Sequence, residues 1–498
     1  MMCGPVAYAA PCCTRVPPVG PTAGRLVAPA SGTVPSAVLS RLYPLRGLPN
    51  QGQLWSWISF DVANQSFTLL INTLLFALFF KEVVVQDPAK DDLLWSLMFT
   101  ASMLLTVVAS PIAGAIADER QWKKAFLLVS GFSCGVLTCM LGLIQPGQLW
   151  LAALLYIPAN FMFNIGENFL ASFLPEVSRR ADYGKVSGFS WGTAYTAALL
   201  LLVLTAAAML VFGLATPDRW RPLFVFAGLW FIAMAIPTAI WLKESSAAPA
   251  SVVPSPPGVK RPGPIAAGVS RLKDSLRSTR EYRDLTMLLL ASLFYGAGMN
   301  VIIFFASILA SDFGFSDINL VVFVAVITVS GIGGTIVTTL VQDKIGHKLT
   351  TVLLLLVWIA TALAFVFYAQ AAERIAGPTG AMDRVPKWPL WLLGNLIGFG
   401  LGSLGSANRA FVGALTPPSR TGEVFGLWGM VFKLAAVLTI PFALAKDKLG
   451  TPAALVVLVV FLVIGLVLTL FINERRGGEL AMEGPSASPP AAVPTPSL

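Results

Sequence analysis

Two stretches of this sequence repeat each other and decide the fold. Residues 167–192 read ENFLASFLPEVSRRADYGKVSGFSWG, and residues 409–429 read RAFVGALTPPSRTGEVFGLWG. In each stretch a charged residue, Glu167 or Arg409, stands eight positions before a proline, and a series of spaced glycines follows. These features occur in the same order in both stretches, so they predict that the chain is a duplication.

An earlier pair of segments repeats in the same order along the chain. Gly114-Ala-Ile-Ala-Asp118 and Thr339-Leu-Val-Gln-Asp343 both end in an aspartate that basic residues follow. Any one agreement could arise by chance, but several in the same order are much harder to explain in that way. Parallel repeats of this kind place the substrate between two halves that rock against each other.

The apolar content of the chain predicts that both halves lie in a membrane. Of the 498 residues, 56% are hydrophobic and 12% are charged, whereas a soluble globular chain carries about 25% charged residues. Apolar runs long enough to cross a bilayer recur along the sequence, and in lipid such runs form helices. We therefore predict an all-α polytopic membrane protein with two pseudo-symmetric six-helix bundles. The predicted spans are 57–80, 93–117, 125–144, 149–173, 187–213, 222–242, 285–310, 318–342, 350–370, 388–413, 424–445 and 453–472.

The polar segments divide the chain into five parts. We predict a disordered arm over 1–53, a six-helix bundle over 54–243, a linker over 244–284, a second bundle over 285–475 and a disordered tail over 476–498. Basic residues beside apolar ones at helical spacing indicate an amphipathic helix in the linker. With twelve spans, most of the 34 Lys and Arg residues fall on the side of the termini. The positive-inside rule then places both termini in the cytoplasm. No organelle address is visible, which favours a bacterial plasma (inner) membrane.

Several function classes find no support in the sequence. The single histidine cannot build a histidine metal cluster or a Ser/His triad, and no Gly-Lys-Ser/Thr phosphate loop is present. We therefore expect no metal, no cofactor and no enzymatic activity. The net charge of +9 is explained by the basic residues that gather on one side of the membrane. Nucleic acid is therefore not an expected partner. The expected partners are the lipid bilayer, a small-molecule substrate and a coupling proton, with the chain acting as a monomer.

Four charged residues lie within the predicted spans, where charges are costly and usually functional. They are Asp61, Glu167, Arg409 and Lys433. Because Glu167 and Arg409 occupy matching places in the repeat, we predict that they meet between the halves and latch the cytoplasmic side closed. The alternative is that each charge pairs locally within its own half. Asp61 or Glu167 could carry the coupling proton.

Polar residues recur at helical spacing on spans one and four, which puts each set on one helix face. Such a face predicts a wet cavity, although hydrogen bonds between helices would explain it as well. The stripes are Asp61, Gln65, Thr68 and Asn72 on span one, and Asn160, Asn164 and Asn168 beside Glu167 on span four. Further cavity candidates are Asn64, Tyr295, Asn300, Asn395 and Trp428.

The aspartate motif predicts a conformational switch. Asp118 stands at a helix end, where a carboxylate can pair with cations or with the N-terminus of an opposing helix. Positive-inside topology alone would explain the basic neighbours, but not this aspartate. The predicted switch residues are Gly114, Asp118, Arg120, Lys123, Lys124 and Asp343.

Short segments spread over about residues 54–475 carry a resemblance to a known family. The Gly-x-x-x-Asp pattern of Gly114–Asp118, with basic residues after it, resembles the loop motif of the major facilitator superfamily. Within that superfamily the chain resembles the vacuole effluxer-like branch, named for a fungal autophagy-related permease. The segments that carry this resemblance are Trp57–Phe67, Ser110–Asp118, Phe173–Glu176, Lys185–Gly192 and Gly422–Lys433. Trp122 stands near an expected basic residue, and Ala297 lies where the branch tends to carry an acid.

The resemblance implies a transporter that moves a small polar solute by alternating access, either by facilitated flow or by coupling to a gradient. Fungal relatives are associated with amino acid export, which makes amino acids the candidate substrate class. Two other functions stay open at this point. A non-transporting sensor or scaffold on the same fold would need no polar cavity, and a lipid or amphiphile translocator would need an apolar one.

Overall fold

Twelve helices in the described part of the chain are long and apolar enough to cross a membrane, as predicted. The structure is a computed structural model, and it describes residues 45–87, 91–214, 216–244, 282–313, 317–377 and 382–483. All of them belong to the compact unit Pro44–Leu498. The predicted amphipathic linker helix and most of the predicted N-terminal arm lie outside the described residues.

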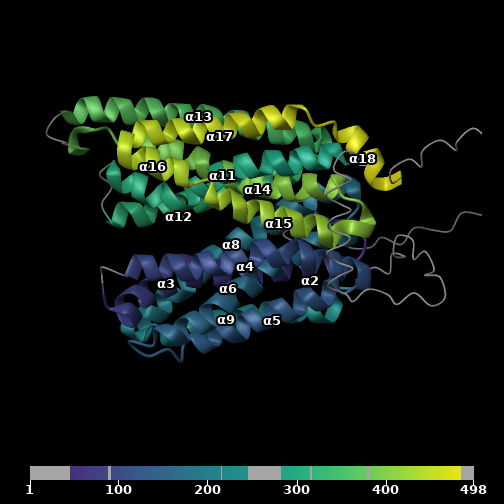
Figure 1. Cartoon of the computed structure of the whole chain (residues 1–498), viewed down its shortest axis with the longest axis horizontal. Coiled ribbons are helices and arrows are strands. Elements are labelled where there is room, and N and C mark those ends of the chain that lie inside the picture. The colour runs from purple at the N-terminus through teal and green to yellow at the C-terminus, as the bar shows by residue number, and fades with distance from the viewer. Residues whose placement is uncertain are drawn as a thin grey trace, which may run out of the picture. The chain divides into compact units, whose positions relative to one another are not determined.

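The first six spans form the lower bundle in Figure 1, coloured purple to blue-green. Three prolines lie inside its helices, at Pro111, Pro158 and Pro237. The helices are α2 (Gln51–Gln65), α3 (Leu75–Phe79), α4 (Asp91–Arg120), α5 (Lys123–Leu141), α6 (Leu149–Ser172), α7 (Leu174–Val177), α8 (Tyr183–Val211) and α9 (Arg221–Trp241).

The last six spans form the upper bundle in Figure 1, coloured green to yellow, with a short amphipathic helix after them. The helices are α11 (Arg283–Asp312), α12 (Asp317–Ile345), α13 (His347–Ala376), α14 (Trp388–Leu415), α15 (Thr421–Val437), α16 (Ile440–Leu449), α17 (Thr451–Leu470) and α18 (Glu474–Glu483).

Span one is irregular where the polar stripe was predicted. After α2 the chain forms π-helical turns over Ser66–Leu74, the short helix α3 and further π-helical turns over Phe80–Val85. A π-helix closes its hydrogen bonds from i to i+5 and therefore holds more residues in each turn than an α-helix. Residues spaced by four and three along this span consequently do not remain on one face.

The two bundles contact each other most extensively through two helix pairs, α4 with α15 and α8 with α12, and also where α8 meets α14 and α6 meets α15. Small residues let the backbones approach closely in the first two pairs. A side chain at Gly114 would collide with the backbone of Gly422 on α15, and one at Gly188 would collide with Thr339 on α12. The glycines that the sequence repeats therefore form the seam between the bundles.

Both predicted boundaries of the membrane region need correction. The tail was predicted to be disordered from residue 476, but α18 extends to Glu483 and buries Gly477 and Ala481. The arm was predicted to extend to residue 53, but α2 begins at Gln51 and Leu45 is fully buried. A prediction that relies on long apolar runs assigns short amphipathic segments of this kind to the arm or the tail.

Candidate functional site

An ion pair joins the bundles between α2 and α14. The Nη1 atom of Arg409 lies 2.8 Å from Oδ2 of Asp61. The arginine side chain is only 3% exposed and the aspartate side chain 13%. Ser190 on α8 also donates a hydrogen bond to the same carboxylate. Both charges are thus largely removed from water and depend on each other.

The rest of the Arg409 guanidinium is also satisfied by protein groups. Its Nε donates to Oγ of Ser187 at 3.0 Å, and its Nη2 donates to the Ser187 carbonyl at 3.2 Å. The indole rings of Trp57 and Trp191 lie 4.7 and 5.9 Å from the guanidinium carbon. A cation over a tryptophan face is stabilised further when it is desolvated. An arginine that bonds through each of its three nitrogens and stacks on tryptophan is suited to holding α14 against the first bundle.

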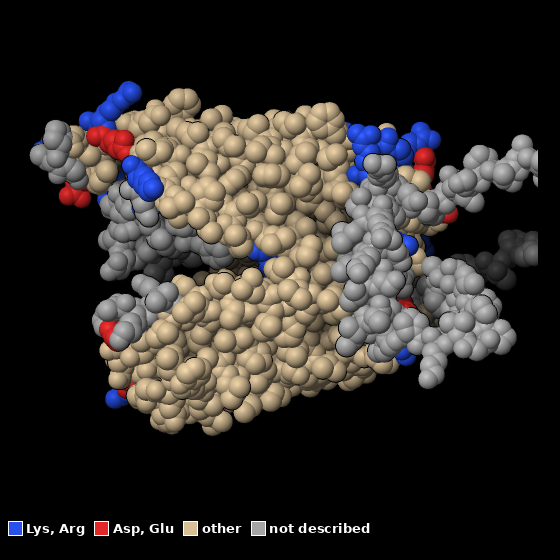
Figure 2. Space-filling view, viewed as in Figure 1, with Lys and Arg blue, Asp and Glu red and all other residues tan. Residues whose placement is uncertain are grey.

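A second pair joins the bundles between α6 and α15 and differs in character. Lys433 Nζ lies 3.9 Å from Glu167 Oε2, and these side chains are 19% and 41% exposed. Figure 2 shows a hollow between the bundles at the end away from α18, with atoms of a basic side chain visible in it. Glu167 and Lys433 belong to opposite bundles and both stay partly exposed, so this pair lies at the seam and is less shielded than the first.

The predicted contact between Glu167 and Arg409 is wrong for this structure. Arg409 pairs with Asp61, and Glu167 pairs with Lys433. All four predicted charges do lie between the bundles. Matching repeat positions fix where along the helix each charge stands, but not which way it points around the helix axis.

Two aspartates hold the bundles together at the end that carries α18, which we call the closed end. Asp118, on the last turns of α4, accepts hydrogen bonds from the backbone N–H groups of Gly422 and Glu423 at 2.9 and 2.7 Å. Asp343 on α12 accepts from Gly184 and Lys185, both at 2.7 Å. Each carboxylate thus meets the positive N-terminus of a helix from the other bundle, as one of the two predicted pairings required.

The predicted basic switch residues serve different contacts at this end. Lys123 forms an ion pair with Glu176 and donates to Oγ1 of Thr421 in the second bundle at 2.9 Å. Lys124 donates to a carbonyl of α9, which is in its own bundle. Arg120 is exposed and lies over the ring of Trp122. Of the three, only Lys123 crosses between the bundles by a contact to a described residue.

Two carboxylates, one in each bundle, were missed by the sequence analysis. Each caps the start of a helix in its own bundle. Glu244 accepts from the backbone N–H groups of Lys123 and Lys124 at the start of α5, at 3.0 Å each. Glu474 accepts from His347 and Lys348 at the start of α13, at 3.0 and 2.8 Å. Each glutamate follows the last span of its half by a few residues, so an alignment of the two halves could have found the pair.

The asparagines of span four do not line the hollow, contrary to the cavity prediction. Asn160 donates to Ser102 on α4 at 2.7 Å and accepts from Asn72 at 3.1 Å. Asn168 donates to Ser110 on the same helix at 2.8 Å. Asn164 is buried as well and bonds back to the Asn160 carbonyl. These side chains tie α6 to α4 and span one inside the first bundle.

The remaining cavity candidates, apart from Asn64, bond to or pack against protein groups; the buried side-chain oxygen of Asn64 has no hydrogen-bond partner among the described residues. Tyr295 is fully buried and bonds to Ser292 and Asn408 within the second bundle. The side chains of Asn300 and Gln65 bond to backbone carbonyls one turn earlier on their own helices. Asn395 bonds to Ser330 on α12, Asn64 is buried, and Trp428 packs against Phe425 and Phe432.

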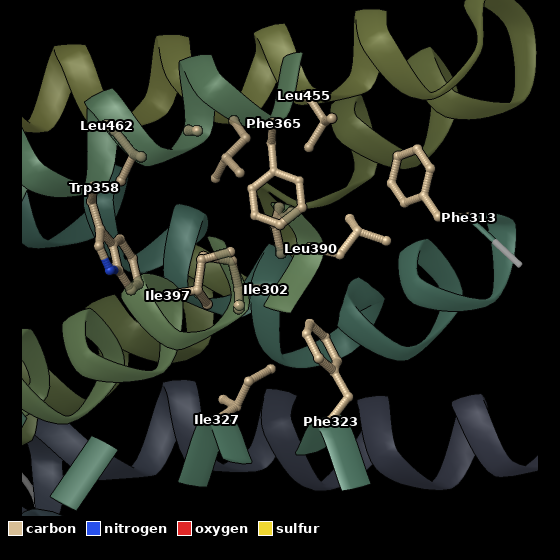
Figure 3. Close-up of a pocket in the computed structure, with 14 residues that line it drawn as sticks. Ile302, Phe313, Phe323, Ile327, Trp358, Phe365, Leu390, Ile397, Leu455 and Leu462 are labelled. Atoms are coloured by element: carbon tan, nitrogen blue, oxygen red, sulfur yellow. The ribbon is translucent and has the colours of Figure 1, made fainter. Parts of the chain in front are cut away.

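A small apolar cavity of about 40 Å³ lies inside the second bundle, apart from the charged pairs. Figure 3 shows Phe365, Phe323 and Leu390 pointing into it from different helices. The indole nitrogen of Trp358 has no hydrogen-bond partner among the described residues. Because the cavity lies within one bundle, rocking of the bundles would not open it at the seam.

The described residues contain no group of three or more His, Cys, Asp or Glu side chains that could hold a metal ion. The site is therefore defined by charged pairs, helix caps and aromatic rings. Sequence reasoning missed Ser187, Trp57 and Trp191 as partners of Arg409, and Ser190 as a partner of Asp61. The spaced serines and tryptophans near the repeat glycines were the available signal.

Comparisons with known proteins find a matching family and solved structures of similar fold. A family model described as vacuole effluxer Atg22 like matches residues 94–481. An uncharacterized MFS-type transporter, YxiO of Bacillus subtilis, is 25% identical over 86% of this chain and 96% of its own. Autophagy-related protein 22 of Pichia angusta is 23% identical over 68% of this chain and 67% of its own.

Solved transporters share the fold at low sequence identity. The proton:xylose symporter XylE is 14% identical, with a TM-score of 0.61 over 86% of this chain and 98% of its own. The major facilitator superfamily transporter FucP, in an outward conformation, is 12% identical, with a TM-score of 0.62 over 85% of this chain and 98% of its own.

Proposed function

Because the chain belongs to the vacuole effluxer Atg22-like family of the major facilitator superfamily, we propose that it transports a small polar solute, with amino acids as the substrate class. The observation that supports this proposal is the partly exposed pair of Glu167 and Lys433 between the bundles. An amino acid carries an ammonium and a carboxylate close together. The amino acid could therefore replace the ion pair between Glu167 and Lys433 with two new ion pairs. Its ammonium would bind Glu167 and its carboxylate would bind Lys433.

The two ion pairs would then have separate tasks. The buried pair of Asp61 and Arg409 is shielded from water and belongs to the contact that keeps the closed end shut. The pair of Glu167 and Lys433 is open enough to exchange partners. Substrate binding would relieve the direct attraction between α6 and α15, and the bundles could then rock about the glycine seam. A proton on Glu167 would have the same effect, which offers a route for coupling to a proton gradient.

The sidedness of the transporter follows from charge. Most Lys and Arg residues belong to the loops and segments at the closed end under the twelve-span topology. By the positive-inside rule we propose that this end and both termini face the cytoplasm. A plasma membrane in a bacterium remains the proposed location.

No specific observation favours either alternative function, the scaffold or the amphiphile translocator. A scaffold on this fold would have no need of an exposed charged pair between its halves. An amphiphile translocator would need an apolar hollow at the seam, whereas the apolar cavity of Figure 3 lies within one bundle.

The test is uptake by purified protein in liposomes, with labelled amino acids, sugars and nucleosides, with and without a pH gradient. We expect amino acid uptake that Glu167→Gln and Lys433→Met each reduce at least tenfold. Asp218→Asn is the matched control, because Asp218 is an exposed acid in the loop before α9. Uptake of sugars or nucleosides but not amino acids would refute the substrate class, and absence of any uptake would refute transport.

A further inference from the structure

A basic pocket lies on the outer side of the second bundle at the closed end, away from the hollow. It is open, has a volume of about 640 Å³, and forms where α11 and α13 begin and α17 ends. Arg283, Lys348 and Arg475 contribute to its lining. Figure 2 shows Lys and Arg atoms gathered at the α18 end of the upper bundle, directly beside its broad apolar flank.

The carboxylates near this pocket are already committed to protein partners. Glu474 accepts the two backbone N–H groups at the start of α13. Asp284 accepts two hydrogen bonds from Arg476, both at 2.8 Å, and one from the backbone N–H of Asn473. These bonds fix α18 beside α11 and leave the pocket with a surplus of positive charge.

The remaining cations are available to an outside anion. Within the part of the chain that the structure describes, neither Arg283 nor Lys348 forms an ion pair. Arg475 pairs with Glu479 through an exposed bond, and its side chain is 89% exposed. Three cations from three different segments therefore converge on one open pocket.

The same pocket has an apolar side. Leu470 and Phe471 line it and are 52% and 64% exposed. The Nζ atom of Lys348 donates to the Leu470 carbonyl at 2.7 Å, which holds the ammonium group at the end of α17, where the apolar surface begins. A ligand with an anionic head and an apolar tail would satisfy both sides at once.

We propose that this pocket binds one anionic phospholipid, with its phosphate held by Arg283, Lys348 and Arg475 and its acyl chains lying along Leu470 and Phe471. Basic pockets between transmembrane helices are suited to anionic head groups. A lipid fits better than a soluble phosphate because exposed Leu470 and Phe471 give the pocket an apolar side. The binding itself is independent of the proposed substrate, and only its assignment to the cytoplasmic leaflet depends on the proposed sidedness.

The experiment uses the full chain, purified in detergent. Its thermal midpoint is measured while phosphatidylglycerol, or phosphatidylcholine with the same acyl chains, is added, and again with glycerol 3-phosphate or inorganic phosphate. We expect saturable stabilisation by phosphatidylglycerol alone. Each basic residue should change the half-saturating lipid concentration about fivefold, so Arg283→Gln/Lys348→Gln/Arg475→Gln should abolish saturation in the accessible range.

A matched control separates this site from general charge attraction. Arg219→Gln/Arg374→Gln/Arg384→Gln removes the same charge from exposed positions outside the pocket and should retain the lipid response. An equal loss in the control, an equal response to phosphatidylcholine, or a retained response in the pocket variant would overturn the proposal. A response to inorganic phosphate equal to that of the lipid would show a free-anion site and would also overturn it. If the triple variant does not fold, Arg283→Gln/Arg475→Gln, at two exposed positions, takes its place.

Discussion

Asp118 on α4 and Asp343 on α12 perform the same contact in opposite directions across the seam. Asp118 receives the first N–H groups of α15, and Asp343 receives those of α8. Each bond pair ties the end of a helix in one bundle to the start of a helix in the other. Because the two contacts are related by the internal repeat, the closed end is held at two matched points.

Loss of either aspartate should weaken the closed end. A carboxylate at a helix N-terminus contributes about 0.3–1 kcal/mol, and up to about 2 kcal/mol when partly buried. We expect Asp118→Asn or Asp343→Asn to increase maleimide labelling of Ala414→Cys several-fold, in a background without the five native cysteines. Ala414 is a suitable reporter because it is buried and its carbonyl accepts a bond from Arg180 of the first bundle.

Two further variants make this result interpretable. Combining the two substitutions should add their effects, because the contacts are separate. Asp218→Asn, in an exposed loop, should leave labelling unchanged. If neither single variant alters labelling of Ala414→Cys, the aspartates do not hold this end closed.

Removal of Arg409 should be costly because it leaves a largely buried carboxylate without its partner. Breaking a buried ion pair from one side costs roughly 3–5 kcal/mol. We expect Arg409→Gln to lower the thermal midpoint strongly and Asp61→Asn/Arg409→Gln to recover a substantial part of the loss. Arg409→Lys should recover little, since an ammonium cannot reproduce the bonds to Asp61 and Ser187 together with the stacking on Trp57. A double variant no more stable than Arg409→Gln would contradict this account.

The asparagines of span four should matter for stability and not for substrate affinity. Hydrogen bonds between membrane helices contribute about 0.6 kcal/mol on average and up to about 1.7 kcal/mol. We expect Asn160→Ala and Asn168→Ala to lower the thermal midpoint by an amount of this order while leaving the half-saturating substrate concentration within twofold. A tenfold change in that concentration without loss of stability would restore the cavity interpretation for these residues.

The sequence predicts where charges and helix ends stand better than it predicts their partners. Spaced residues locate Asp118, Asp343, Glu167 and Arg409 along their helices, because a repeat preserves position along the chain. The partner of a side chain depends on the direction in which it points around its helix axis. The π-helical turns after Gln65 change this direction, and no residue pattern in the sequence predicts those turns. A polar face likewise predicts a polar neighbour, but not whether that neighbour is water or another helix, and so Asn160 was placed in the cavity.

The glycines of α8 provide a test of the seam itself. A Cβ atom at Gly188 would lie 2.9 Å from the backbone nitrogen of Thr339 and 3.0 Å from the carbonyl oxygen of Thr335, so backbone atoms on α12 would have to move. We expect Gly188→Ala to separate α8 from α12, raise labelling of Ala414→Cys several-fold and slow transport. Gly333→Ala, at a position on α12 with open space around the new methyl group, should behave like the parent protein. Equal behaviour of the two variants would mean that the close approach at Gly188 is not what holds the bundles together, and the rocking surface would then have to lie elsewhere.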